Sequence, residues 1–242
     1  MTIPASMPSS GGFSATCWSL VLNASGAGAG GDGALDELCR RYRHPVYAYL
    51  RHAGHQPQAA RDITRTFFAD LIASPLAGLA HARRQRFRDF LLQRLRGFLD
   101  ADWRELPGTN ALAWAPDVDE LEARDQRDNP PEAAPVDAFQ RSFAAEVMAR
   151  ALARLGDEAR AAGHGAMYEA LLPHLTRDPS PAGYAALAAA LGQRPLALIV
   201  ALKRLRQRFR ELVGRELSDT VGSAADLADE QKTLHGFFSA GG

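Results

Sequence analysis

Apolar residues along this chain recur every three or four positions, the spacing that places them on one face of a helix. No segment of any length shows the strict alternation expected of a half-buried strand. The pattern therefore predicts an all-α protein. We expect one helix to begin at 18–22 and others to cover 32–52, 57–73, 84–104, 137–155, 164–175, 184–191, 195–212 and 225–238.

Segments of biased composition divide these helices into two groups. The stretch 105–136 is rich in proline and acidic residues and has little periodicity, which is typical of a linker with one short turn near 118–123. The composition predicts a disordered tail at 1–16, a helical domain at 17–104, an acidic Pro-rich linker at 105–136, a second helical domain at 137–217 and an acidic extension with a short helix at 218–242.

The stretch 184–212 has the outline of a helix-turn-helix, which places one helix in the major groove of DNA. A short Ala/Leu helix runs into Gly192, a residue suited to end a helix in the left-handed conformation. A longer, strongly basic helix follows, although two helices of an ordinary bundle would look similar. Its apolar positions form a core-facing set (Leu198, Ala201, Leu202, Leu205, Phe209, Leu212) and an outward set (Leu196, Ile199, Val200).

The net charge is zero, with 28 basic and 28 acidic residues, but the charges alternate in blocks. Residues 40–104 carry 13 Arg against 5 Asp, and residues 194–217 carry 7 basic against 2 acidic side chains. Residues 105–137 carry 9 acidic residues against 2 Arg, and 218–242 carry 4 against 1 Lys. Separate basic blocks suit contact with phosphate at two places, although solvated helix faces would give the same pattern.

Aromatic and Arg residues alternate within the basic block of the first domain. Aromatic rings stack on unpaired bases while Arg neutralises phosphate, a combination used by proteins that bind single strands. Phe87, Phe90 and Phe98 fall on the apolar face and are expected in the core. The candidates for contact with a single strand are Arg83, Arg84, Arg86, Arg88, Arg96, Trp103 and Arg104.

Two sets of motifs occur in a recognisable order. The first set is Ala-x-Asp-Ile-Thr-x-x-Phe-Phe at 60–68 and Arg-x-Arg-Phe-Arg-x-Phe-Leu at 84–91. The second set is Tyr-x-x-Leu-Ala-x-x-Leu-Gly at 184–192 and Leu-Lys-Arg-Leu-Arg-x-Arg-Phe-Arg-Glu-Leu at 202–212. With an acidic linker between the sets, the chain from about residue 18 onward resembles the bacterial RNA polymerase sigma factors of the extracytoplasmic-function group.

The resemblance implies a transcription initiation factor that acts by binding. Its partners would be core RNA polymerase, whose clamp the first domain contacts, and promoter DNA, whose melted strand that domain captures and whose duplex the second domain reads. An anti-sigma protein as a third partner is left open. The polymerase-binding positions would be Asp62, Thr64, Phe67 and Phe68. The duplex-binding candidates are Arg194, as the one base reader, with Lys203, Arg204, Arg206 and Arg208.

The sequence departs from the sigma-factor pattern at two places. After Thr64, where relatives usually carry Gln and then an acidic or small residue, this chain has Arg65 and Thr66, a difference expected to alter the polymerase contact. The recognition helix begins with apolar residues, which touch thymine methyl groups but cannot read a donor–acceptor pattern. The exposed apolar patch therefore has another interpretation, as a surface for an anti-sigma protein or for the chain's own C-terminal helix. A helical adaptor and a helix-turn-helix repressor are the alternative functions, and the aromatic–Arg block argues against the repressor.

The sequence gives no sign of catalytic chemistry. His52 and His55 form an HxxH pair, but no second ligand pair follows at zinc spacing. A P-loop, a GxGxxG motif and a nucleophile elbow are also absent, so we expect no enzyme, no metal and no cofactor. Cys17 and Cys39 form no CxxC, and we find no signal peptide or long apolar run. These features predict a cytoplasmic protein without membrane insertion.

Overall fold

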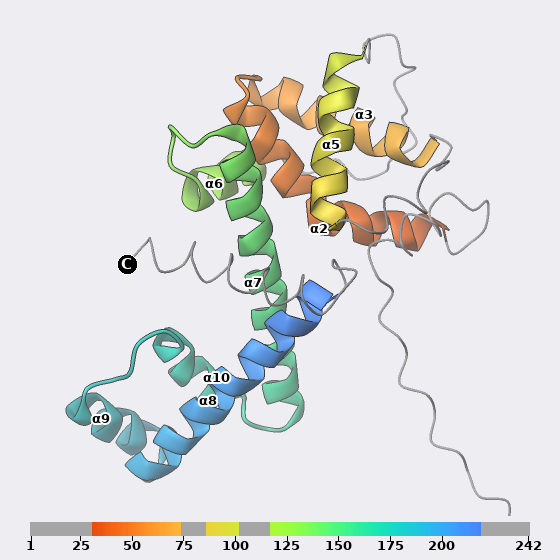
Figure 1. Cartoon of the computed structure of the whole chain (residues 1–242). Coiled ribbons are helices and arrows are strands. Elements are labelled where there is room, and N and C mark those ends of the chain that lie inside the picture. The colour runs from red at the N-terminus through yellow and green to blue at the C-terminus, as the bar shows by residue number, and fades with distance from the viewer. Residues whose placement is uncertain (1–30, 74–85, 102–116, 219–242) are drawn as a thin grey trace, which may run out of the picture.

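The computed structural model describes residues 31–73, 86–101 and 117–218, and every regular element within these ranges is helical (Figure 1). The all-α prediction is therefore confirmed for the described part of the chain. Both ends, with the expected tail and the expected first and last helices, lie outside it. The elements are α2 (Gly31–His52), α3 (Pro57–Ala73), α5 (Phe87–Asp100), α6 (Val118–Asp128), α7 (Pro135–Ala161), α8 (Gly165–Leu171), the 3-10 helix η2 (Leu172–His174), α9 (Pro181–Leu191) and α10 (Pro195–Ser218).

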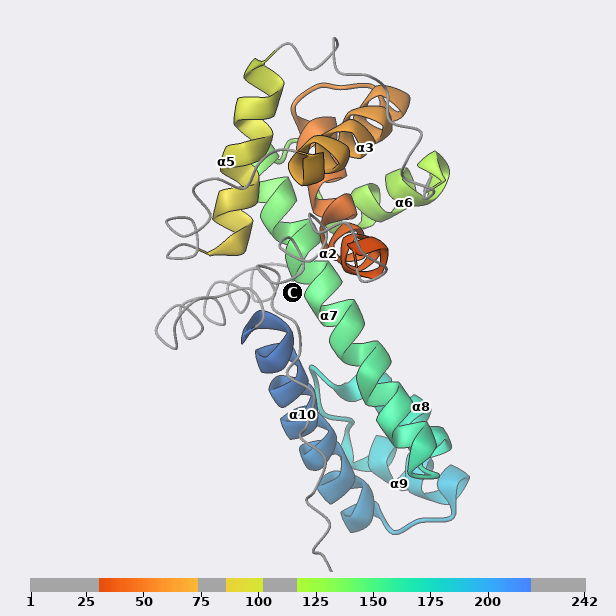
Figure 2. The same ribbon diagram turned by 90° about the vertical axis from the view of Figure 1, so that its right-hand side faces the viewer.

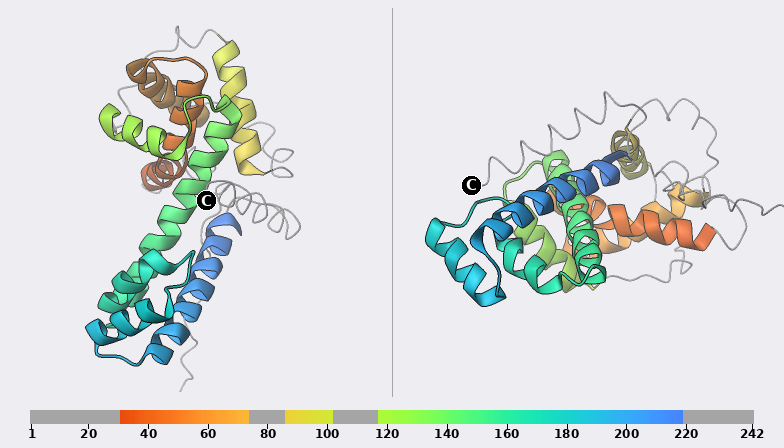
Figure 3. Two further views of the ribbon diagram at one scale, coloured as in Figure 1. Left: turned by 90° about the vertical axis from the view of Figure 1, so that its left-hand side faces the viewer. Right: turned by 90° about the horizontal axis from the view of Figure 1, so that it is seen from below.

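The helix α7 joins the two ends of the molecule. Its 27 residues run beside α2 over the first half and beside α10 over the second (Figures 1 and 2). The helices α2, α3, α5 and α6 gather around one end of α7, and α8, α9 and the start of α10 around the other (Figure 3). At 1.5 Å per residue, α7 is about 40 Å long. It begins before the predicted residue 137 because Pro135 suits a first helical position.

The larger core lies between α2, α3, α5 and the first half of α7. Its largest buried side chains are mostly aromatic, and the ring of Tyr42 stacks on that of Phe143 with 5.6 Å between centroids. Phe67 of α3 meets Phe98 of α5 edge-on at 5.5 Å. Leu217, near the end of α10, also belongs to this core. The last turn of α10 therefore ties the second group of helices to the first.

A smaller core supports the second group of helices. It is centred on Leu155 of α7, Tyr168 of α8 and Leu212 of α10. The hydroxyl of Tyr168 donates a hydrogen bond to the C=O of Leu152 at 3.0 Å. The ring of Tyr168 lies 3.1 Å from the place that a Cβ atom at Gly156 would occupy. Glycine at 156 therefore allows α8 to pack closely on α7.

An 11-residue helix, α6, lies where the sequence predicts a linker with one short turn. The side chain of Asp117 caps α6 by accepting a hydrogen bond from the N–H of Asp119 at 3.0 Å. Leu121 is buried in the larger core. The described part of the acidic segment is therefore an integral element of the first group of helices rather than a free spacer, and residues 102–116 lie outside the described ranges.

Candidate nucleic-acid interface

The helices α9 and α10 form a helix-turn-helix. Leu191 ends α9, Pro195 begins α10, and the two axes are bent by 98°. Gly192 takes the left-handed conformation (φ 61°, ψ 31°), and the N–H of Gln193 donates to the C=O of Ala188 at 2.9 Å. A three-residue turn and a crossing near a right angle are the dimensions of helix-turn-helix motifs. The predicted turn at Gly192 is confirmed.

The first half of α10 has an apolar side that faces the solvent. Leu198 and Leu202 are buried against the second group of helices, as the sequence predicts. Leu196, Ile199 and Val200 are exposed to 71%, 44% and 42%. The predicted outward direction of these three side chains is therefore confirmed. A recognition helix in this position would present aliphatic groups to the DNA bases, which limits direct readout to contacts with thymine methyl groups.

Three of the predicted duplex-binding cations are available to a ligand. Arg194, Lys203 and Arg204 are exposed, and none of them pairs with another residue in the described part of the chain. Arg194 directly precedes α10, where the N-terminal residues of a recognition helix reach base edges. Lys203 and Arg204 follow about two and a half turns later and are candidates for contact with phosphate.

Arg206 has a structural role instead of the predicted DNA contact. Its guanidinium donates to the C=O of His174 at 2.6 Å and to the C=O of Leu175 at 2.9 Å. A third nitrogen lies 2.7 Å from a carboxylate oxygen of Asp178. These contacts cap the end of the 3-10 helix and leave few donors for phosphate. We therefore remove Arg206 from the set of DNA-binding candidates.

Arg208 is also committed to contacts within the protein. It forms two parallel hydrogen bonds with the carboxylate of Glu158 on α7, at 2.6 and 2.7 Å, and a third with Glu211 at 3.0 Å. The hydrogen bonds from Arg208 lower the pKa of the Glu158 carboxyl. A bidentate pair satisfies the guanidinium fork, so the predicted DNA contact of Arg208 is corrected as well.

The helix α5 presents only part of the predicted single-strand surface. Arg88 is buried, with its guanidinium 6.0 Å from the ring centroid of Phe143, so its predicted strand contact is corrected. Arg86 is half-buried at the N-cap of α5. Arg96 is exposed beside a hollow of about 310 Å³ between α5 and the start of α7. The remaining candidates, Arg83, Arg84, Trp103 and Arg104, lie outside the described residues.

The predicted polymerase-binding positions on α3 are mostly buried. Phe67 and Phe68 belong to the larger core, because the helical period turns both rings toward α2 and α5. The hydroxyl of Thr64 is buried and donates to the C=O of Ala60 at 2.7 Å. Asp62 is exposed and pairs with the neighbouring Arg61. Of the four predicted positions, Asp62 alone presents its side chain to a partner, and the other three support the fold.

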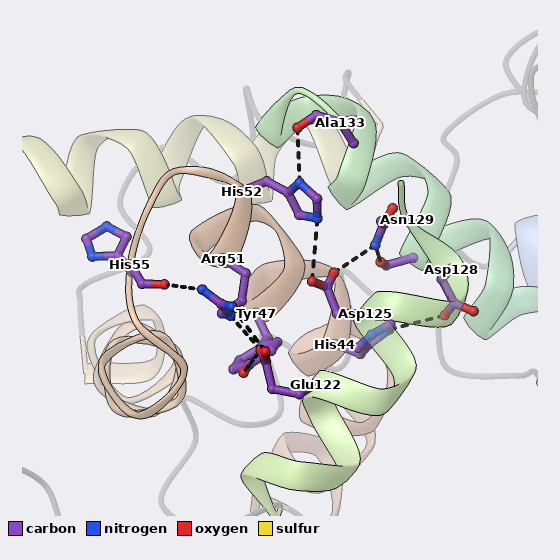
Figure 4. A network of polar contacts seen from close by, with 11 residues as sticks. His44, Tyr47, Arg51, His52, His55, Glu122, Asp125, Asp128, Asn129 and Ala133 are labelled. Carbon is purple, nitrogen blue, oxygen red and sulfur yellow. Dashed lines mark hydrogen bonds and ion pairs between the residues drawn. The ribbon is translucent and has the colours of Figure 1, made fainter. Parts of the chain in front are cut away.

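A polar network between α2 and α6, which was not predicted from the sequence, joins the acidic segment to the first group of helices (Figure 4). Glu122 accepts hydrogen bonds from the hydroxyl of Tyr47 at 2.5 Å and from Arg51 at 2.5 and 3.0 Å. Asp125 lies 3.4 Å from the ring of His52. The signal was present as acidic residues three apart in 122–128 and polar residues three or four apart in 44–52, but the proline-rich flanks favoured a linker.

His44 lies in this network with its ring fully buried. Burial, followed by the charges of Arg124, Arg127 and Arg43, lowers the pKa of His44 to about 3. The ring is therefore neutral near pH 7, and its Nδ1 lies 3.8 Å from the carboxylate of Asp128. Within the described ranges, no group of three or more His, Cys, Asp or Glu residues is arranged to hold a metal ion. The contacts of the network join α2 to α6.

An apolar groove of about 810 Å³ lies between α7, α8 and the first half of α10. We call it the α8–α10 groove. Its walls include Leu155 and Met167 on one side and Leu196 and Val200 on the other. Arg194 and Arg204 also line it, together with Glu158 and Arg208, which pair with each other. The exposed apolar side of α10 is thus one wall of a concave surface.

No protein-family model matches the chain, and no curated protein or solved structure matches it either. No single helix in the described ranges is long and apolar enough to span a membrane; α9 and α10 reach that length only as a pair, across their 98° bend. The features of the described structure that bear on function are the helix-turn-helix, the exposed side chains of Arg194, Lys203 and Arg204, and the α8–α10 groove beside them.

Proposed function

We propose that this chain is a sigma-like transcription initiation factor that binds promoter duplex DNA through α10 and recruits RNA polymerase. The observation that carries the proposal is the helix-turn-helix itself, with its short turn, its 98° bend and an exposed second helix. Arg194, Lys203 and Arg204 supply positive charge on that helix and its turn. Affinity would come mainly from phosphate contacts, with little direct base readout by the apolar residues.

The first group of helices supports the second part of the proposal. The exposed side of α5 carries Arg96 beside a hollow, and Asp62 is exposed on α3. These features lie at the opposite end of α7 from the helix-turn-helix (Figures 1 and 3). A separation of this kind suits a factor that contacts DNA and polymerase at two distant points. Melted-strand binding and the polymerase contact remain parts of this proposal.

A second candidate function is that of a helical adaptor that binds another protein. The exposed apolar side chains of α10 and the α8–α10 groove favour it, because contiguous apolar surface is typical of protein-binding sites. The two functions differ in the residues on which they depend. Duplex binding requires Arg194, Lys203 and Arg204, whereas an adaptor would depend on Leu196 and Val200.

Duplex binding by the full chain tests the proposed function. Fluorescence anisotropy with a labelled duplex, repeated over a range of salt concentrations, gives both affinity and the number of phosphate contacts. The variant Arg194→Ala/Lys203→Ala/Arg204→Ala should bind more weakly, and its log–log salt slope should fall by about two to three. The variant Arg210→Ala, on the second half of α10, serves as the control. Equal affinity and slope for the triple variant and the wild type would favour the adaptor.

A further inference from the structure

We propose that the acidic C-terminal segment of this chain, residues 219–242, occupies the α8–α10 groove and covers the DNA-binding side of α10. Docking of the segment stands on the groove and the segment's own sequence. Only its consequence for DNA rests on the proposed function. Residues 219–242 would then compete with DNA for the exposed side of α10.

The groove has the chemistry of a site for an amphipathic segment. Leu155, Met167, Leu196 and Val200 give it apolar walls, and Leu196 and Val200 are exposed in the described structure. A helix or strand that buried these side chains would remove apolar area from water, which favours its docking in the groove. A contiguous apolar surface of this kind on a recognition helix is not needed for phosphate contact, so another ligand is implied.

The charges around the groove select an acidic occupant. Arg194 and Arg204 line it and have no partner within the described ranges. Glu158 also lines the groove, but Arg208 neutralises it through two hydrogen bonds. The net field at the groove is therefore positive. An occupant with carboxylates beside its apolar residues would pair with these two arginines, as DNA phosphates would.

The segment 219–242 has the complementary pattern. It carries four acidic residues against one Lys. Leu227, Leu234 and Phe238 are spaced seven and four residues apart, which places them on one face of a helix over 225–238, the range in which the sequence predicts one. Asp226 and Glu230 would both lie along one edge of that face. The segment thus offers an apolar stripe with one acidic edge to an apolar groove that also carries two arginines.

The chain between Ser218 and the segment's apolar residues is long enough to reach the α8–α10 groove. From Val200 to Ser218, the axis of α10 rises about 27 Å at 1.5 Å per residue. If residues 219–224 are extended they cover about 20 Å, and a helix from 225 to 234 adds about 15 Å. Leu234 can therefore return to the groove without any change in α10.

Photo-crosslinking of the full chain tests the proposal. We would place p-benzoylphenylalanine at position 200, irradiate, and map the products by mass spectrometry. A product of monomer mass that joins position 200 to residues 219–242 is expected. Gln58, which is exposed on α3 at the other end of the molecule, is the control position. The variant Leu234→Asp/Phe238→Asp should lose most of the product, whereas Thr220→Asp/Ser223→Asp, with the same added charge, should keep it.

Each other outcome overturns the proposal. A product of dimer mass would assign the groove to a second copy of the chain, and the absence of any product would leave the segment elsewhere. Crosslinking requires no DNA, so it separates this proposal from the proposed function. If both hold and the segment covers α10 nine-tenths of the time, Leu234→Asp/Phe238→Asp should tighten duplex binding about tenfold. Crosslinking with unchanged duplex affinity would overturn the regulatory consequence alone.

Discussion

At the scale of single residues, the arginines of α10 divide by their partners. Arg204 is exposed and has no partner among the described residues, whereas Arg206 caps backbone carbonyl groups and Arg208 pairs with Glu158. The sequence could not separate them, because all three lie within one basic run. Their long-range partners come from α7, from η2 and from the loop that follows η2, 28 to 50 residues away in the chain. Only tertiary packing decides which cations remain for DNA.

The pair Arg204→Ala and Arg206→Ala tests this division. Arg204→Ala should lower duplex affinity for all sequences and reduce the salt slope by about one, with no change in stability. Arg206→Ala should lower the free energy of unfolding by about 1–3 kcal/mol, because it removes charged hydrogen bonds to two carbonyl groups. Its salt slope should match the wild type. Urea denaturation and anisotropy measure the two effects, and a reversed result would reinstate Arg206 as a DNA contact.

His44 gives a prediction about pH. Burial holds its folded pKa near 3, below the unfolded value of 6.5, so the unfolded chain binds the additional proton between these values. The contribution of His44 to stability is therefore complete above pH 6.5 and decreases as the pH falls toward 3. At pH 5 the loss is about 2 kcal/mol, from 1.36 kcal/mol per pH unit.

The variant His44→Gln isolates this effect, because a neutral amide cannot be protonated. Urea denaturation at pH 7 and pH 5 should show a smaller loss of unfolding free energy for the variant than for the wild type. The other titrating carboxyl groups of the network, Glu122 and Asp125, are common to both proteins and cancel in the comparison. Identical losses for the two proteins would show that His44 does not remain neutral in the folded state.

At the scale of elements, the helical period was sufficient to predict helix boundaries where apolar residues hold the helix in place. The predicted range 57–73 coincides with α3, and the predicted end near 52 coincides with the end of α2. The length of helix α6 was underestimated, because most of the contacts that stabilise it are polar. Apart from the buried Leu121, it is held through Glu122, Asp125 and Arg124, which contact α2 and α7. When only its composition is considered, such a helix is interpreted as an acidic linker.

The contact of Glu122 with α2 can be tested by substitution. Glu122→Ala leaves the guanidinium of Arg51 and the hydroxyl of Tyr47 without their shared acceptor, so we expect a loss of about 2–3 kcal/mol in unfolding free energy. Glu120→Ala, at an exposed position in the first turn of the same helix, is the matched control and should change stability by less than about 1 kcal/mol. Equal effects would mean that α6 does not depend on this network.

At the scale of the whole molecule, the sequence predicts the helical class and the position of the helix-turn-helix. It does not predict that one helix, α7, supplies side chains to both cores, because that depends on which neighbours pack along it. The burial of Phe67 and Phe68 follows from the helical period, which the assignment of polymerase-binding positions from the motif did not take into account. The surfaces available to partners are therefore smaller than the motifs imply, and they lie at the two ends of α7.

The most direct test of the proposed function is the capture of the full chain with its partners. The tagged chain would be purified from its native cells after crosslinking, and the associated protein and DNA would be identified by mass spectrometry and sequencing. The proposal predicts core RNA polymerase together with DNA that shares one promoter sequence. The variant Arg194→Ala/Lys203→Ala/Arg204→Ala should retain the polymerase and lose the enrichment of that sequence. Recovery of the chain without core polymerase would contradict the proposal.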